Sequence, residues 1–255
     1  MKYLFLSFAV LFSTAIFAKC AMNGITMLSP NRILNKNGLI ILEFYGTSES
    51  LVPELNKKYP VYLQSGNTKV ALISYEVLKG EFNVTQVVLK TTSLLDENES
   101  YQLFIDNLPR FEEAPKYYYN EQTKQRETIS IKVSSVIDKE APLFTGTIVE
   151  TRKSMVEYGC GPAKWVYFSI TGQDKSSLLV KAGVKNKTTG KTTEYILPIE
   201  NGNVKVGHDM CSGAFHFDNG ESYEVTFSLL DQSGNTSIST DSIAFSSPVK
   251  ATLEE

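Results

Sequence analysis

Two stretches, ENESYQLFIDNL at residues 97–108 and NGESYEVTFSLLD at residues 219–231, share the word ESY followed by an alternating apolar run. Alternation of apolar and polar residues places one set of side chains on one face of a β-strand. The two tyrosines, Tyr101 and Tyr223, are 122 residues apart. That spacing fits one β-sandwich domain of about 100 residues. The echo therefore predicts two tandem copies of one β unit.

Similar alternating runs fill the rest of the chain and are separated by Gly, Asn, Asp and Pro. In the first half we expect strands at 25–28, 39–45, 60–64, 69–78, 85–91, 101–108 and 128–133. In the second half we expect them at 145–152, 165–171, 178–186, 192–199, 213–217, 223–230 and 242–246. No window of comparable length keeps the apolar spacing of a helix. The predicted fold class is all-β.

The boundaries of the two units follow from the ends of the chain and from one hinge. Residues 1–18, MKYLFLSFAVLFSTAIFA, have the charged start, apolar run and small residues of a cleaved signal peptide. The segment SSVIDKEAPLF at 134–144 is polar and contains a proline, as domain linkers often do. We therefore predict a signal peptide at 1–18, one β-sandwich at 19–137 and a second at 138–255.

Short motifs in both halves resemble bacterial immunoglobulin-like domains. In the first half, MLSPN (27–31), LIILEFYG (39–46) and residues 85–108 are similar to the domain found in S-layer-type surface proteins. The second half begins with Asp138, Ala141, Pro142 and Phe144 and closes with the segment from Tyr223 to Asn235, as a second bacterial Ig-like module does. The resemblance implies two tandem immunoglobulin-like β-sandwiches in a bacterial surface or periplasmic protein.

The charge balance argues against two classes of partner. The chain has 25 basic and 28 acidic residues and a formal net charge of −3. Nucleic-acid binding and docking on anionic lipid both need clustered Lys and Arg. No apolar stretch after residue 18 is long enough to span a bilayer. We expect a secreted, periplasmic or outer-surface protein without a transmembrane segment in the mature chain.

The three cysteines are Cys20, Cys160 and Cys211. Cys160 and Cys211 both fall in loops of the second unit, and an oxidising compartment favours a disulfide between them. Closing a loop of about 50 residues is worth about 4 kcal/mol in the chain-entropy model. Cys20 would then be free, lipidated or bonded to another molecule.

Both histidines lie in HDMCSGAFHF at residues 208–217. A zinc or copper site would need His208, Cys211 and His216 to converge with Cys160, and this spacing is a weak metal signature. His216 alternates with Phe215 and Phe217, so we expect its side chain to point outward. We assign no catalytic residue, no metal ligand and no cofactor. Calcium at one of the Asp-rich turns or at the Asp138/Glu140 hinge stays open.

The remaining candidate is aromatic. PKYYYNEQ at 115–122 places Tyr117, Tyr118 and Tyr119 in a predicted loop close to Phe111. Consecutive residues of an extended segment face opposite ways, so at least one tyrosine should be exposed or packed against the second unit. Tyrosine is a common contact residue for proteins and sugars. The alternative is a loop folded over its own sandwich or into the groove between the units.

These observations favour an exported, non-catalytic binding or surface-structural protein. Its partner would be a protein or a glycan at the cell surface, with self-association left open. Two other classes stay in view: a carbohydrate-active enzyme or its accessory module, and a subunit of a surface fibre or secretion assembly. The enzyme would need paired carboxylates in a groove beside exposed aromatics, and the subunit would need an unpaired strand edge.

Overall fold

The computed structural model describes residues 22–28, 33–120 and 123–250. The predicted signal peptide and Cys20 lie outside these ranges. Almost all regular structure within them is β, with a single short 3₁₀ helix, η1 (Gly46–Glu54). The all-β class is therefore confirmed. Across the same ranges, no helix combines the length and the hydropathy needed to cross a bilayer.

The first half of the chain forms one large sheet. Its strands are β1 (Gly24–Leu28), β2 (Ile33–Leu34), β3 (Leu39–Tyr45), β4 (Val61–Ser65), β5 (Thr68–Lys79), β6 (Val84–Thr91), β7 (Ser100–Ile105) and β10 (Ile131–Val133). They are joined in the order β1-β3-β6-β5-β4-β7-β10-β2. Strands β8 (Tyr117–Asn120) and β9 (Gln125–Thr128) form a separate two-stranded hairpin. Strand β1 is one edge of the large sheet.

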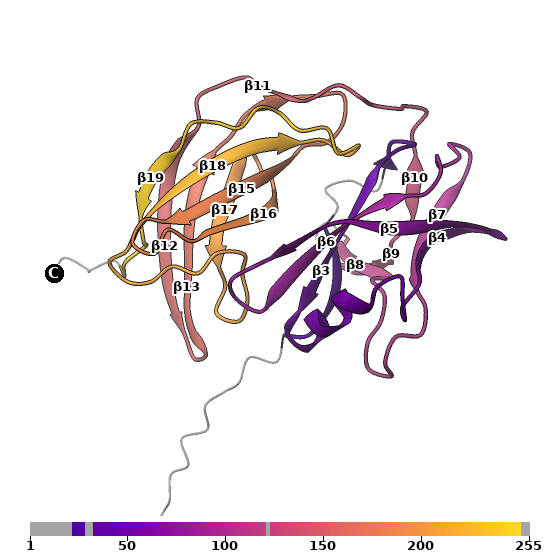
Figure 1. Ribbon diagram of the computed structural model, residues 1–255, viewed down its shortest axis with the longest axis horizontal. Helices are drawn as coiled ribbons and strands as arrows, with labels where there is room; N and C mark the ends of the chain where they lie inside the picture. Colours follow the sequence, from indigo (N-terminus) through magenta and orange to yellow (C-terminus); the bar gives the residue numbers. More distant parts are fainter. Residues whose placement is uncertain (1–21, 29–32, 121–122, 251–255) are drawn as a thin grey trace, which may run out of the picture.

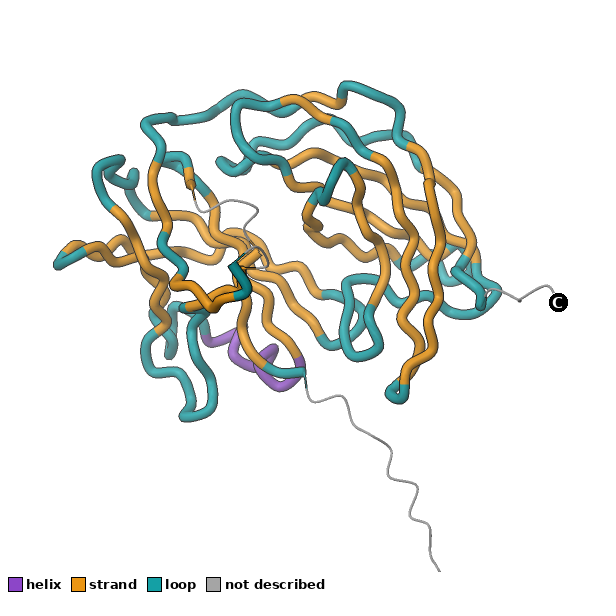
Figure 2. Tube along the Cα trace, turned by 180° about the vertical axis from the view of Figure 1, so that it is seen from behind, coloured by secondary structure: helices purple, strands orange, loops and turns teal. Residues whose placement is uncertain are grey.

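The second half forms smaller sheets that lie beside the first half (Figure 1; Figure 2). Strands β12 (Val149–Tyr158), β13 (Gly161–Ser169) and β17 (Asn203–His208) make one sheet. The other is β16 (Thr192–Pro198), β15 (Leu179–Asn186), β18 (Ser222–Leu230) and β19 (Ile243–Ser246), in that order. The short strands β11 (Leu143–Phe144) and β14 (Gly172–Gln173) pair where the hinge enters this half.

One predicted strand of the second half is wrong. Residues 213–217 are irregular, and the strand that pairs with β13 is β17, ten residues earlier in the chain. Phe215 and Phe217 are fully buried and His216 is exposed, so the predicted facing of these side chains is confirmed. The alternation arises because both phenylalanines turn into the second core, although the segment pairs only through isolated bridges at Gly213.

The hydrophobic residues gather in two cores, and the second core reaches into the first half. One cluster is built from residues 25–133 alone. The other joins the two sheets of the second half with five residues of the large sheet: Leu39, Ile41, Leu78, Val84 and Val88. Strands β3 and β6 are therefore covered on both faces. The two halves share a hydrophobic interface, which the polar hinge at 134–144 did not predict.

The two tyrosines of the sequence echo make the same contact. Tyr101 is 1% exposed, and its hydroxyl accepts a hydrogen bond from the backbone N–H of Asp96 at 3.2 Å. Tyr223 is 2% exposed, and its hydroxyl accepts from the N–H of Asp218 at 2.9 Å. In both halves the donor lies five residues before the tyrosine. This is the tyrosine corner of β-sandwiches, in which a phenol closes the turn that precedes a strand.

Removing either hydroxyl should destabilise the protein by a similar amount. Tyr101→Phe and Tyr223→Phe each remove the hydrogen bond that a buried phenol accepts from the preceding turn, so we expect a loss of about 0.5–1.5 kcal/mol in the free energy of unfolding. Urea denaturation of both variants measures the loss. Tyr75→Phe, on an exposed tyrosine of β5, is the control. A loss in one variant alone would mean that the two corners are not equivalent.

Candidate functional site

The predicted tyrosine cluster forms a β-hairpin and not a loop. Strand β8 carries all three tyrosines and pairs with β9 in antiparallel register. Tyr117 and Tyr119 are about half exposed on one face, and Tyr118 packs against the first core from the other. The prediction that at least one tyrosine is exposed is confirmed. Pairing with β9, the next strand of the same hairpin, makes the segment a strand.

A groove runs between β1, the edge of the large sheet as the described residues form it, and the chain that leads into this hairpin. Its volume is about 440 Å³. One side is β1, which has β3 as its single strand neighbour in the described part of the chain. The other side is formed by residues 111–118 together with Arg126 and Ile129. We call this feature the edge groove.

The edge groove brings together three of the four candidate binding residues. Phe111, Tyr117 and Tyr118 line it, and Phe111 is 92% exposed. Tyr119 does not line the groove, although it lies on the same strand. Tyr117 also borders a smaller cavity of about 230 Å³ on its other side. Two exposed aromatic rings thus stand opposite a strand edge.

Arg126 is a lining residue that the sequence alone did not single out. Its guanidinium lies 4.5 Å from the centre of the Tyr117 ring, a cation–π contact between the two strands of the hairpin. On the groove floor, Glu112 accepts a hydrogen bond from the Ser48 hydroxyl at 2.8 Å. The groove therefore offers aromatic surface, a planar cation and a carboxylate. Only strand pairing, which sets Arg126 opposite Tyr119 and beside Tyr117, could have indicated the arginine.

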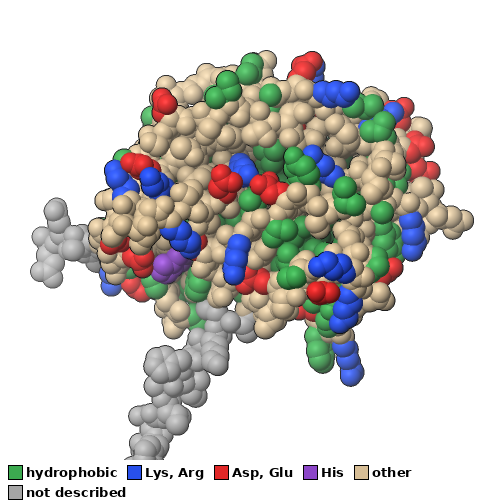
Figure 3. All heavy atoms as spheres, viewed as in Figure 1, with side chains coloured by type: hydrophobic (Ala, Val, Ile, Leu, Met, Phe, Trp, Pro, Cys, Tyr) green, Lys and Arg blue, Asp and Glu red, His purple; other side chains and the backbone are tan. Residues whose placement is uncertain are grey.

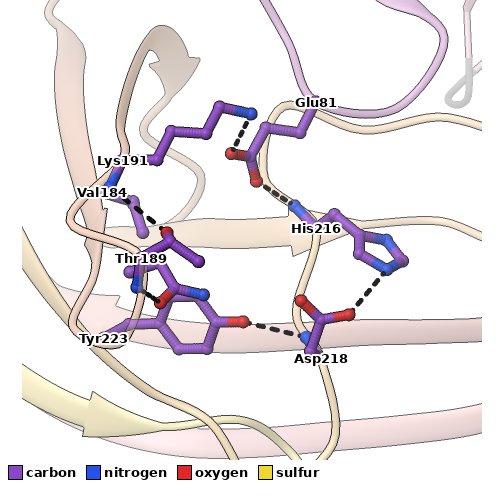
Figure 4. A pocket seen from close by; sticks show the side chains of 8 residues that line it. Glu81, Val184, Thr189, Lys191, His216, Asp218 and Tyr223 are labelled. Carbon is purple, nitrogen blue, oxygen red and sulfur yellow. Dashed lines mark hydrogen bonds and ion pairs between the residues drawn. The ribbon is translucent and has the colours of Figure 1, made fainter.

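A second cavity of about 240 Å³ lies at the junction between the two halves (Figure 4). Glu81 enters it from the turn between β5 and β6 of the first half. Its carboxylate pairs with Lys191 at 3.0 Å and accepts hydrogen bonds from the His216 N–H and the Thr193 hydroxyl, both at 2.8 Å. Burial by itself would raise the pKa of Glu81, but these donors together hold the pKa below its usual value. Glu81 is therefore an ionised bridge between the halves.

The neighbouring Phe82 joins the same turn to the loop of residues 208–217. Its backbone N–H and C=O both bond to Gly213, at 3.1 and 2.8 Å. Its ring meets the His208 and His216 rings edge-on, with centroids 5.7 and 5.9 Å away. The two imidazoles stack on each other at 4.8 Å. The segment of residues 208–217 therefore packs against the turn between β5 and β6 and connects the two halves.

His208 ends strand β17 and is only 1% exposed. Its Nδ1 lies 2.9 Å from the Asp209 carbonyl oxygen, and its Nε2 is buried without a hydrogen-bond partner. Burial lowers the pKa of His208, with smaller contributions from the nearby His216 and Lys164. The folded protein therefore holds this imidazole neutral.

The stability of the protein should fall as the solution is acidified from pH 7 to pH 5. An unfolded histidine takes up its proton near pH 6.5, while His208 in the folded state resists protonation at that pH. The unfolded state then binds more protons, which lowers the free energy of unfolding by up to about 1.4 kcal/mol per pH unit. The lowered pKa of Glu81 acts in a separate window below pH 4.5.

Urea denaturation at pH 7 and pH 5 measures this effect. The free energy of unfolding should differ less between pH 7 and pH 5 in His208→Gln than in the unchanged chain. In His216→Gln the full difference should persist, because His216 is exposed. An unchanged difference in His208→Gln would show that another group causes the acid sensitivity.

The predicted disulfide between Cys160 and Cys211 is not formed in the structure. Cys160 lies at the tip of the β12–β13 hairpin, and Cys211 follows β17. The two segments are neighbours, since a Cβ built on Gly161 would lie 4.0 Å from the Met210 carbonyl oxygen. Cys211 is itself disulfide-bonded, which removes it as a partner for Cys160. Cys20, the third cysteine, lies outside the described residues.

We expect non-reducing peptide mapping to recover Cys211 linked to Cys20. The Met22 sulfur accepts a hydrogen bond from the Ser212 hydroxyl at 3.2 Å, so the start of the described chain lies beside the neighbour of Cys211. Two residues of chain span about 7 Å, enough for the Cα separation of a disulfide. Recovery of a Cys160–Cys211 peptide would contradict this pairing and restore the prediction from sequence.

The surface charges are mixed. On the face seen in Figure 3, basic and acidic side chains alternate among apolar and neutral ones, and no patch of one sign dominates. Elsewhere in the described chain, opposite charges also pair, as in Lys181–Glu76 at 2.6 Å and Lys187–Glu224 at 2.9 Å. This face lacks the clustered positive charge that phosphate backbones require.

Comparison with known proteins identifies no family for the chain. No family model and no curated protein match the chain. Among solved structures, a cytokine receptor complex is similar over 89% of this chain and 98% of its own, with 8% identity and a TM-score of 0.26. Tandem Ig repeats of Dlar match over 86% and 96%, with 9% identity and a TM-score of 0.24. A pullulanase from Anoxybacillus sp. LM18-11 in complex with maltotriose matches over 78% of this chain, with 9% identity and a TM-score of 0.24, and this chain spans only 24% of its length. At these TM-scores the similarities carry no assignment for this chain.

Proposed function

We propose that this protein is an exported, non-catalytic binding module, built from two immunoglobulin-like units, that recognises a protein partner through the edge groove. The observation that carries the proposal is the free edge of β1 facing Phe111 and Tyr117 across one groove. Export rests on the signal-like residues 1–18 and remains part of the proposal. The partner would lie on or outside the cell surface.

An extended segment of the partner fits this arrangement. A strand edge presents backbone N–H and C=O groups to a peptide that adds itself as a further strand, and adjacent pockets select its side chains. Exposed aromatic rings supply contact area at a low entropic cost. The arginine and the glutamates beside the groove would favour a segment that carries both charges.

The polar groups at the junction support a structural role there. Glu81 is an ionised acceptor of three donors, and the Tyr223 hydroxyl accepts from the Asp218 backbone N–H. These hydrogen bonds hold the turn of Glu81 and the turn before β18 in place at the junction.

The test is selection of binders from a library of displayed peptides of about ten residues, with the chain as bait. Selected peptides should bind the double variant Phe111→Ser with Tyr117→Ser at least tenfold more weakly than the unchanged chain. They should keep their affinity for Tyr75→Ser, which removes an exposed tyrosine outside the groove. Hydrogen exchange at residues 24–28 should slow when the peptide binds.

Three results would overturn the proposal. Peptides that bind the double variant as well as the unchanged chain would place recognition elsewhere. Binding to a glycan array through the same two aromatics, without slower exchange in β1, would favour the carbohydrate-module alternative. Concentration-dependent self-association that the double variant abolishes would identify β1 as an assembly edge and favour a fibre subunit.

A further inference from the structure

Three aspartates from distant parts of the chain converge at the junction of the hinge with the second half. Asp138 belongs to the hinge, Asp174 follows β14, and Asp231 follows β18. One carboxylate oxygen from each lies within 4.8 Å of the other two. Asp231 is fully buried, Asp138 is 3% exposed, and Asp174 is partly buried. Among the described residues, this is the one group of three or more potential ligands that meets in this way.

Each carboxylate is held in place by hydrogen bonds from its own turn. Asp138 Oδ1 accepts from the Glu140 N–H at 3.0 Å, and Asp174 Oδ1 accepts from the Ser176 N–H at 2.7 Å. Asp231 Oδ1 accepts from two backbone N–H groups, of Ser233 and Asn235, both at 2.8 Å. The orientation of all three carboxylates is therefore fixed by the backbone.

One oxygen of this group has no partner. Asp138 Oδ2 is buried, and no donor of the described structure reaches it. A buried carboxylate oxygen without a partner is costly, and the cost rises when two further carboxylates lie close by. None of the ion pairs between described residues includes Asp138, Asp174 or Asp231. The nearby Lys175 pairs at 2.7 Å with Glu140, on the solvent side.

From this geometry we propose that Asp138, Asp174 and Asp231 form a calcium-binding site that fixes the hinge. A divalent cation would neutralise the three carboxylates and supply the missing partner of Asp138 Oδ2. The set contains only oxygen donors, which suits a hard cation and not zinc or copper, which favour nitrogen and sulfur. Calcium accepts the irregular arrangement of turn carboxylates and waters that such a site provides, whereas magnesium demands a compact octahedron.

The position of the site gives the cation a structural task. Asn37, just before β3, accepts hydrogen bonds from the Asp138 N–H at 3.3 Å and from the Ser233 hydroxyl at 3.1 Å, and it donates to the Asp138 carbonyl at 2.8 Å. The first half, the hinge and the turn after β18 thus meet one residue away from the three carboxylates. A bound cation would hold these parts together at the place where the chain passes between the halves (Figure 1).

The test measures stability and binding separately. The unfolding temperature of the full chain should be several degrees higher in ~5 mM CaCl₂ than in EGTA. Extracellular calcium modules have dissociation constants of ~0.1–1 mM, so this concentration fills the site. MgCl₂ at the same concentration should give a clearly smaller shift. Isothermal titration with CaCl₂ should show one site, and terbium should report the same site by luminescence.

Two variants separate the cation from the fold. Asp174→Asn and Asp138→Asn keep an oxygen that accepts the turn hydrogen bond but remove one negative charge. In EGTA both variants should be at least as stable as the unchanged chain, because repulsion is relieved. Their calcium affinity should fall at least tenfold, and the calcium-dependent shift should disappear. Asp241→Asn, on an exposed aspartate of the second half, is the matched control and should keep the full shift.

The proposal is overturned if calcium neither shifts the unfolding temperature nor binds in the titration. It is also overturned if the shift survives in Asp174→Asn, or if magnesium stabilises as much as calcium. A protonated aspartate in place of a cation would show itself as an unfolding temperature that rises below pH 6 in EGTA and ignores calcium. None of these outcomes bears on the edge groove, so the two proposals stand or fall separately.

Discussion

Gly213→Ala is expected to lower the free energy of unfolding by about 3 kcal/mol, because the new methyl group has no room. A Cβ built on Gly213 would lie 2.3 Å from both Cα and Cβ of His208. These are backbone and near-backbone atoms, which cannot turn away as the end of a flexible side chain could. The backbone of Gly213 cannot move either without breaking its two hydrogen bonds to Phe82.

The strain should appear as a lower urea midpoint and as faster hydrogen exchange in the turn of residues 80–83. Gly159→Ala is the matched control, at the tip of the β12–β13 hairpin, where a built Cβ meets no atom within 4 Å. We expect that control to change the stability by less than about 0.5 kcal/mol. Equal stabilities of the two variants would show that the loop at residues 208–217 can move to make room for the methyl group at little cost in free energy. The contact with Phe82 would then not be rigid.

Local patterns in the sequence predicted the strands well where one face of each strand is buried. The runs at 39–45 and 223–230 became β3 and most of β18, and the shared ESY word became a matched pair of tyrosine corners. These features depend on residues close together in the chain. Alternation and turn chemistry describe such local structure directly.

The contact between the halves was missed although a signal for it was present. Residues 84–89 of β6 are all buried, which requires cover on both faces of the strand. A continuous apolar run of this kind is typical of strands packed on both sides. The β-propensity of TQVVLKT predicts a strand at this position. It does not indicate which part of the chain packs on the second face of that strand.

The sites lay beyond the reach of local patterns. Glu81 and Phe82 read as an ordinary turn, and their partners are 110–135 residues further along the chain. Asp138 and Asp231 were seen as parts of short motifs that mark the start and the close of a module, but Asp174 carries no motif. Only the folded chain sets the three side by side. The tyrosine cluster was found by composition alone, and its pairing with Arg126 came from the register of β8 with β9.

A second polar contact between the halves is made by Gln86, which is fully buried in the middle of β6. Strand β16 is an edge of its sheet, and the Gln86 amide completes that edge as a further strand would. Its Nε2 donates to the Ile196 carbonyl at 2.9 Å, and its Oε1 accepts from the Ile196 N–H at 3.0 Å. The same amide donates to Glu43 at 3.2 Å, and Glu43 also accepts from the Tyr195 hydroxyl.

Gln86→Ala should therefore lower the free energy of unfolding by about 2–4 kcal/mol. It removes the amide and leaves both backbone groups of Ile196 buried without a partner, next to a new cavity. Urea denaturation measures the loss, and hydrogen exchange should become faster in β16 before it does so in β15. Gln102→Ala is the matched control, because Gln102 lies exposed in β7 of the same large sheet, and its loss should stay below about 0.5 kcal/mol. If the two variants are equally stable, water takes the place of the Gln86 amide at the edge of β16. Solvent would then reach the backbone of Ile196 at the interface between the halves.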